Sequence, residues 1–290
     1  MSAQTIDGAV AGIPRRVSPL RTIARWEYRN SVRARWVLVM AGIFGVLSIV
    51  VTLLAFRTVR ELGLAGIGPA SATLVNLGVL LPSLMGLLLG AGSVVGAREQ
   101  GVLPMMAAQP VRRSTIVTGM FAGLTASLWT TLAVGFGAAL LVMSGVAKGN
   151  DVPAIVTLLA ATFGVAMASV SIGVALSTAS RTRAQAVAGA VGLWIMLALG
   201  VDLALAALAP SVHMGPGGLL AAVLVNPLEA CRILALLGTD LRGAALGPFG
   251  AYLITTFGVA GTIAILIADL FVWTAVPLLV ARWLLPRRDL

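Results

Sequence analysis

The stretch WVLVMAGIFGVLSIVVTLLAF, from Trp36 to Phe56, decides the fold class of this 290-residue chain. It holds 21 residues without a charge and is bounded by Arg35 and Arg57. A helix rises about 1.5 Å per residue, so this stretch would be roughly 30 Å long and would match the hydrocarbon core of a bilayer. We therefore expect a membrane-spanning helix here.

Charged residues delimit five further apolar segments of similar length. Together the six segments predict an all-α integral membrane protein with six transmembrane helices. The predicted spans are 36–56, 72–95, 116–142, 153–176, 187–208 and 259–281. The stretch 243–281 is ambiguous by hydropathy, because it could hold one long span or two short ones.

The distribution of basic residues favours six spans. Cytoplasmic loops of membrane proteins carry an excess of Lys and Arg. With six spans and a cytoplasmic N-terminus, most of the 20 basic residues are cytoplasmic, whereas seven spans would leave three C-terminal arginines outside. We predict a flexible cytoplasmic N-terminus 1–19 that is not a signal peptide, a transmembrane domain 36–281 with an outer loop 209–258, and a cytoplasmic C-terminus 282–290.

The composition excludes several classes of protein. Hydrophobic residues make up 59% of the chain and charged residues only 10%, against about 25% in a soluble domain. A water-soluble enzyme and a nucleic-acid-binding domain are therefore excluded. The chain has one His (His213), one Cys (Cys231) and one Lys (Lys148, not in a phosphate-binding loop). We expect no catalytic residues, no metal and no cofactor held by this chain.

Residues 20–35, LRTIARWEYRNSVRAR, precede the first span and predict an amphipathic helix lying on the membrane. Basic side chains recur every four residues and form one stripe, with an aromatic residue on its flank: Arg21, Arg25, Arg29 and Arg33, with Trp26. Such a stripe suits contact with anionic lipid headgroups. The alternative is an ordinary basic segment that only fixes the topology.

The loop between the second and third spans, 96–115, combines charges with an apolar middle. Arg98 and Glu99 begin it, Val102, Leu103, Met105 and Met106 follow, and Arg112 and Arg113 end it. An exposed apolar segment in water has to pack on something. Either the loop docks a soluble partner or it folds back against its own bundle, and spacing alone leaves both readings open.

The pattern Glu99-x-Gly101-x-Leu103, then Pro110-Val111-x-Arg113 and Gly119, resembles the corresponding loop of ABC-2-type permeases. These are the membrane subunits of ABC transporters. The resemblance implies a type V exporter-like fold, with an interfacial helix before six spans and a coupling helix that touches an ATPase, which binds ATP and Mg. Val102 and Pro104 depart from the family pattern, so the coupling helix is expected to be short or to begin after Pro104. The expected ATPase-coupling residues are Arg98, Glu99, Gly101, Leu103, Met105, Met106 and Arg113.

The second half of the chain resembles one subgroup of that family, the NosY-type permeases of the system that matures nitrous oxide reductase. The matching positions are Gly192, Trp194, Asp202, Asn226, Pro227, Arg232, Val276 and Pro277. The resemblance implies a bacterial inner-membrane homodimer with two ABC ATPase subunits and a periplasmic β-helical protein. It implies export of a sulfur-containing species for copper-site assembly; export of a drug or a lipid is the alternative. Asn226, Pro227 and Arg232 are candidate contacts for the periplasmic partner.

Two carboxylates fall within predicted spans, Asp202 and Asp269. A charge in hydrocarbon costs at least a few kcal/mol, so both side chains should face the bundle interior, a cavity or the interface. They are candidates for the substrate path, and the alternative is a structural role. An intramembrane enzyme would need a nucleophile with a base, or a metal, and the spans offer neither. A passive channel would need a polar stripe, where only isolated polar residues occur.

Overall fold

The structure is a computed structural model, and it describes residues 18–62, 68–144, 152–200, 203–204, 207, 215–239 and 246–285. Within these ranges the ordered elements are helices. In chain order they are α1 (Pro19–Arg33), α2 (Arg35–Leu62), α3 (Gly68–Glu99), α4 (Val102–Ala107), α5 (Arg113–Ser144), α6 (Val152–Ala179), α7 (Arg183–Ile195), the π-helical turn η2 (Met196–Gly200), α9 (Pro216–Leu224), α10 (Pro227–Thr239) and α11 (Gly247–Leu284).

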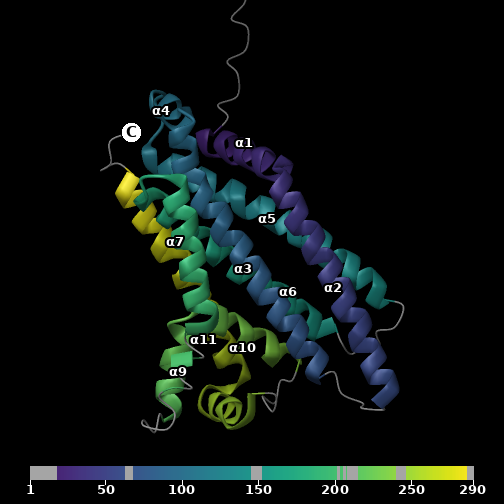
Figure 1. Cartoon of the computed structure of the whole chain (residues 1–290). Helices are drawn as coiled ribbons and strands as arrows, with labels where there is room; N and C mark the ends of the chain where they lie inside the picture. The colour runs from purple at the N-terminus through teal and green to yellow at the C-terminus, as the bar shows by residue number, and fades with distance from the viewer. Residues whose placement is uncertain are drawn as a thin grey trace, which may run out of the picture.

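The helices form an elongated bundle with two distinct ends. One end holds α1, α4 and the C-terminal part of α11, and we name it the α4 end; the other holds α9 and α10, and we name it the α9 end (Figure 1). In the described part of the chain five helices are long and apolar enough to cross a membrane, or up to seven elements if each bent helix pair counts as one span. The predicted all-α membrane fold is confirmed, and the predicted six spans lie within this range.

Glycines allow the central helices α3 and α6 to cross at very short distance. A Cβ built on Gly173 would lie 2.5 Å from the carbonyl oxygen of Leu87 and 2.9 Å from the nitrogen of Ala91. A Cβ on Gly90 would lie 2.7 Å from the nitrogen of Val174. Small residues at such crossings bring backbones together, which is how membrane helices gain packing energy without a hydrophobic driving force. These glycines therefore allow α3 and α6 to pack closely within one chain.

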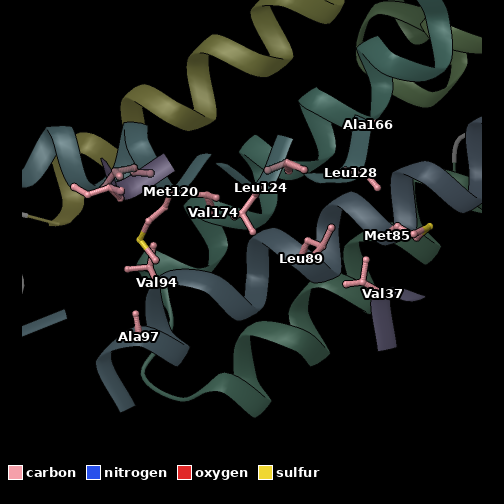
Figure 2. Close-up of a cluster of buried hydrophobic side chains, with 14 of the residues drawn as sticks. Val37, Met85, Leu89, Val94, Ala97, Met120, Leu124, Leu128, Ala166 and Val174 are labelled. Atoms are coloured by element: carbon pink, nitrogen blue, oxygen red, sulfur yellow. The ribbon is translucent and has the colours of Figure 1, made fainter. Parts of the chain in front are cut away.

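A buried apolar cluster joins α3 to its neighbours on the other sides. Met120, Leu124 and Leu128 of α5 lie against the α3 face that carries Leu89 and Val94 (Figure 2). The same cluster reaches α2, α6 and the C-terminal end of α11. The helices that carry the α4 end are thus packed through one continuous core.

The segment predicted as the outer loop, 209–258, contains α9, α10 and the beginning of α11 among its described residues. Pro216 and Pro227 each stand at the first position of a short helix, where the missing N–H costs nothing. The two helices meet at an angle of 112°. Helix α11 begins at Gly247 but breaks at Gly258, whose φ of 71° ends one helical segment before the last span.

The predicted span 187–208 also differs from the structure. Helix α7 begins at Arg183 and changes to the π-helical turn η2 at Met196. A π-helical turn is rare and often marks a functional position in a helix. Asp202, predicted within this span, lies outside the described residues.

Candidate functional site

Helix α4 is a single short helix at the end of the long helix α3. The turn that separates them needs Gly101, whose φ of 72° is left-handed. Pro104 is the third residue of α4, within the first turn, where backbone N–H groups have no partner inside the helix. The helix is therefore short, as expected, but it begins before Pro104 and not after it.

The two faces of α4 differ in exposure. Leu103 is only 1% exposed and belongs to the buried cluster that also contains Ile116 and Met120. Met106 packs partly against the same cluster. Met105 is 67% exposed and points away from the core.

The prediction that Leu103 anchors a partner is therefore wrong, since this side chain holds α4 against its own bundle. Met106 is half-buried for the same reason. One face of α4 therefore folds back against the bundle, as the second reading expects, while the other face, with Met105 beside Pro104, is exposed.

Arg98 and Glu99, the last residues of α3, bind the turn between α6 and α7. A guanidinium nitrogen (Nη2) of Arg98 donates to the carbonyl oxygen of Ser180 at 2.5 Å, one residue beyond the end of α6. An Oε1 atom of Glu99 accepts the backbone N–H of Arg183, the first residue of α7, at 2.8 Å. The positive side chain therefore meets the C-terminal end of one helix and the negative side chain the N-terminal end of the next, which is the favourable sign at both helix dipoles.

The turn itself is organised by its own side chains. Thr182 caps α7 by accepting the N–H of Gln185 at 3.3 Å, and the Gln185 amide oxygen accepts the N–H of Arg181 at 3.0 Å. This reciprocal pattern is close to a capping box. Arg98 and Glu99 therefore bind a preformed turn, and we name the two residues together with Ser180–Arg183 the clamp.

The remaining predicted coupling residues stand around this clamp. Gly101 is exposed in the turn before α4, and Arg113 is the half-buried first residue of α5. Sequence reasoning missed the turn Ser180–Arg183 as part of the site. The sequence feature that could have revealed this turn is the Thr182-x-x-Gln185 cap pattern, which stands beside two arginines at the end of the fourth span.

Helix α1 packs across α5 at the α4 end. Ile23, Glu27 and Ser31 recur every four residues and are buried. A Cβ on Gly119 would lie 2.9 Å from the Cβ of Ile23, and a Cβ on Gly123 would lie 2.7 Å from the Cβ of Glu27. Burial raises the pKa of Glu27 from 4.5 to about 7.

The opposite face of α1 carries the predicted basic stripe. The four arginines of the stripe are exposed, and so is Trp26 beside them: the stripe comprises Arg21, Arg25, Arg29 and Arg33. The structure therefore brings these five residues to one surface, directed away from α5.

At the α9 end, Asn226 and Pro227 are buried. The amide nitrogen (Nδ2) of Asn226 donates to the Leu197 carbonyl in η2 at 2.7 Å, and its Oδ1 accepts the N–H of Leu228 at 3.0 Å. Arg232 is half-buried and forms an ion pair with Glu229 at 2.8 Å. The predicted contact with a periplasmic partner is wrong for Asn226 and Pro227, because the fold uses both to begin α10 and ties Asn226 to η2.

Asp269 lies in α11 and is half-buried. Its Oδ2 is buried and makes no hydrogen bond within the described part of the chain. Cys231 is a buried free cysteine whose thiol donates to the carbonyl of Ala161 at 3.1 Å. The described residues contain no group of three or more His, Cys, Asp or Glu side chains placed to hold a metal.

These features define a multi-pass membrane protein with a short helix presented at one end of its bundle. Residues 21–290 match the model described as ABC-2 family transporter protein. The chain belongs to this family, so it is a transport subunit and not an enzyme.

Two relatives are similar to the chain over most of its length. A "Probable ABC transporter permease protein NosY" of Stutzerimonas stutzeri is 29% identical over 278 residues, which cover 92% of this chain and 97% of the relative. A protein of the same name from Pseudomonas aeruginosa is 29% identical over 233 residues, which cover 77% of this chain and 83% of the relative. The predicted resemblance to NosY-type permeases is thereby confirmed.

Proposed function

We propose that this chain is the permease of an ABC exporter in the inner membrane and that a separate ABC ATPase docks on α4. The α4 end then faces the cytoplasm together with both termini. Two copies of the chain pair, and each binds one ATPase subunit; ATP and Mg are bound by that ATPase and not by this chain. The observation that carries the proposal is the split of α4 into a buried face with Leu103 and an exposed face with Met105.

The exposed face of α4 has the character of a binding hot spot. Met105 presents an apolar side chain at an end of the bundle that faces water in this orientation. Methionine adapts its shape to a partner pocket, and interfaces concentrate their energy in a few such anchors. Leu103 fixes the base of α4, so a force applied to Met105 would be transmitted to the bundle and would not merely displace a loose loop.

Two features away from α4, the arginine stripe on α1 and Asp269 in α11, also belong to the proposal. The arginine stripe would bind anionic lipid headgroups, since its side chains are exposed along one face of α1. Asp269 is a candidate for the substrate path because one of its carboxylate oxygens is buried and has no hydrogen-bond partner among the described residues.

The proposed cargo rests on the NosY-type resemblance. We propose export of a sulfur-containing or copper-related species for the maturation of nitrous oxide reductase, with delivery to a periplasmic β-helical protein. The alternative is export of a drug or a lipid. ATP hydrolysis by the reconstituted complex should rise with a sulfur or copper species and not with lipids or drugs; stimulation by the latter alone would assign the alternative cargo.

Docking is tested by co-purification with the ABC ATPase encoded nearest to this chain. Met105→Ala should weaken retention of the ATPase about five- to ten-fold, since truncating an interface anchor costs more than about 1 kcal/mol. Met196 is also 67% exposed but lies in η2, so Met196→Ala is the matched control and should retain the ATPase fully. Equal retention by both variants would show that α4 is not the docking site.

A further inference from the structure

Further contacts between α3, α6 and α7 support the clamp. The side chain of Arg183 lies over Gly92 of α3, where a Cβ would stand 3.6 Å from its guanidinium nitrogens. Further along the same contact, the backbone N–H of Val95 donates to Ser177 Oγ of α6 at 3.0 Å. The ends of α3, α6 and α7 are therefore fixed to one another by Arg98, Glu99 and these contacts.

Along the chain, only two residues separate α4 from this assembly. Gln100 and Gly101 separate Glu99 from Val102. The N–H of Gly101 returns to the carbonyl of Arg98 at 3.0 Å, so the connecting turn is itself closed onto the clamp. A displacement of α4 therefore acts directly on Arg98 and Glu99.

Helix α7 connects the clamp to the far side of the bundle. It runs from the clamp at Arg183 into η2, and Asn226 ties the Leu197 carbonyl of η2 to the start of α10. Helix α7 thus lies between the end of the bundle that holds α4, the proposed ATPase contact, and the end that holds the bent helix pair α9–α10 (Figure 1).

We propose that Arg98 and Glu99 are positioning residues that couple α4 to α7, so that a movement of α4 caused by the ATPase moves α7 through the α6–α7 turn. This inference rests on the proposed function, because it needs an ATPase at α4. It departs from the expectation that these two charges face the ATPase, since both are bonded to their own chain. A substrate gate at the α9 end would then be driven through α7.

The test uses the full complex of permease and ATPase with two cysteine reporters in a Cys231→Ala background. One reporter replaces Gln109, which is exposed just after α4, and the other replaces Leu199, which is exposed in η2. The rate of labelling by a small thiol reagent is measured with and without ATP. In the otherwise unchanged chain both reporters should respond to ATP.

The double variant Arg98→Gln, Glu99→Gln should keep the response at position 109 and lose it at position 199. Each lost bond lies at or near the surface and should lower the population of the clamped state only about two- to five-fold, so the double variant removes both. The swapped variant Arg98→Glu, Glu99→Arg keeps the charge composition but places each sign at the wrong helix end, so it should uncouple equally. Arg35→Gln changes an exposed arginine at the start of α2, outside the clamp, and is the matched control.

The outcomes separate this inference from the proposed function. If the ATPase fails to bind the unchanged chain, or the reporter at 109 never responds, the proposed function is wrong. If the ATPase binds and position 109 responds, but the double variant still transmits the response to position 199, the clamp proposal is overturned. A swapped variant that remains coupled would overturn the clamp proposal as well. Glu99→Asp keeps the carboxylate and should therefore retain part of the coupling that the double variant loses.

Discussion

A methyl group added at Gly90 should destabilise the bundle by about 2 kcal/mol. The atoms that it would meet are backbone atoms of α6, including the Val174 nitrogen at 2.7 Å, so no side-chain rotation can relieve the overlap. Overpacking of this kind costs about 1–3 kcal/mol, and rigid neighbours favour the upper end. Alanine returns about 0.5–1 kcal/mol through its better helix propensity, which leaves the net loss stated.

Gly42→Ala is the matched control. Gly42 lies within α2, and nothing stands within 4 Å of a Cβ at that position. The added methyl group should therefore only improve helix propensity, and the variant should be as stable as the unchanged chain or slightly more stable. Both variants would be purified in the same detergent and their apparent Tm measured by tryptophan fluorescence.

The expected loss at Gly90 corresponds to a fall in apparent Tm of about 4–8 °C. Gly173→Ala should lower the Tm similarly, because it forces apart the same crossing from the α6 side. The double variant should cost less than the two single losses together, since helices that have already separated leave room for the second methyl group. If Gly90→Ala were as stable as Gly42→Ala, close backbone contact would not be what holds α3 on α6.

Two further predictions concern single buried polar groups. Glu27 has its pKa raised from 4.5 to about 7, so between these values the folded protein binds a proton more tightly than the unfolded chain. The free energy of unfolding should therefore fall by about 3 kcal/mol as the pH rises from 4.5 through 7, and Glu27→Gln should abolish this fall. If Glu27→Gln showed the same difference in Tm between pH 5 and pH 8 as the unchanged chain, the prediction would be contradicted. Asn226→Ala removes the cap of α10 and leaves the buried Leu197 carbonyl without its donor, which should cost about 3 kcal/mol by thermal unfolding. Asn226→Ser keeps a capping oxygen, so its stability should lie between those of the unchanged chain and Asn226→Ala. Equal stability of all three chains would refute the structural role of Asn226.

The sequence predicted the membrane fold well, because a span needs about 20 apolar residues and charges interrupt such runs visibly. The amphipathic helix before the first span was predicted for the same kind of reason, since a four-residue repeat of arginines is a local pattern. In these features each signal lies within one element.

The site was predicted less well because its contacts are not local. Spacing within the six-residue helix α4 cannot tell which face meets the bundle, so Leu103 was assigned to a partner although it is buried. The partners of Arg98 and Glu99 lie more than 80 residues further along the chain. Asn226 was predicted to contact a periplasmic partner from the family resemblance alone, and its burial follows only from the bend between α9 and α10.

The chemistry of the clamp indicates what it is for. The bond of Glu99 is exposed and that of Arg98 is part-buried at the bundle end, so water can replace much of what a lost partner supplies and the two bonds add little to stability. The guanidinium and the carboxylate instead add geometric specificity, because each bond forms only when the end of α3 is in register with one particular helix end. Loss of the clamp should therefore leave the Tm of the permease nearly unchanged while it alters the motion of α7. A large fall in Tm in the clamp variants would show that these charges hold the fold together, and the case for coupling would then fail.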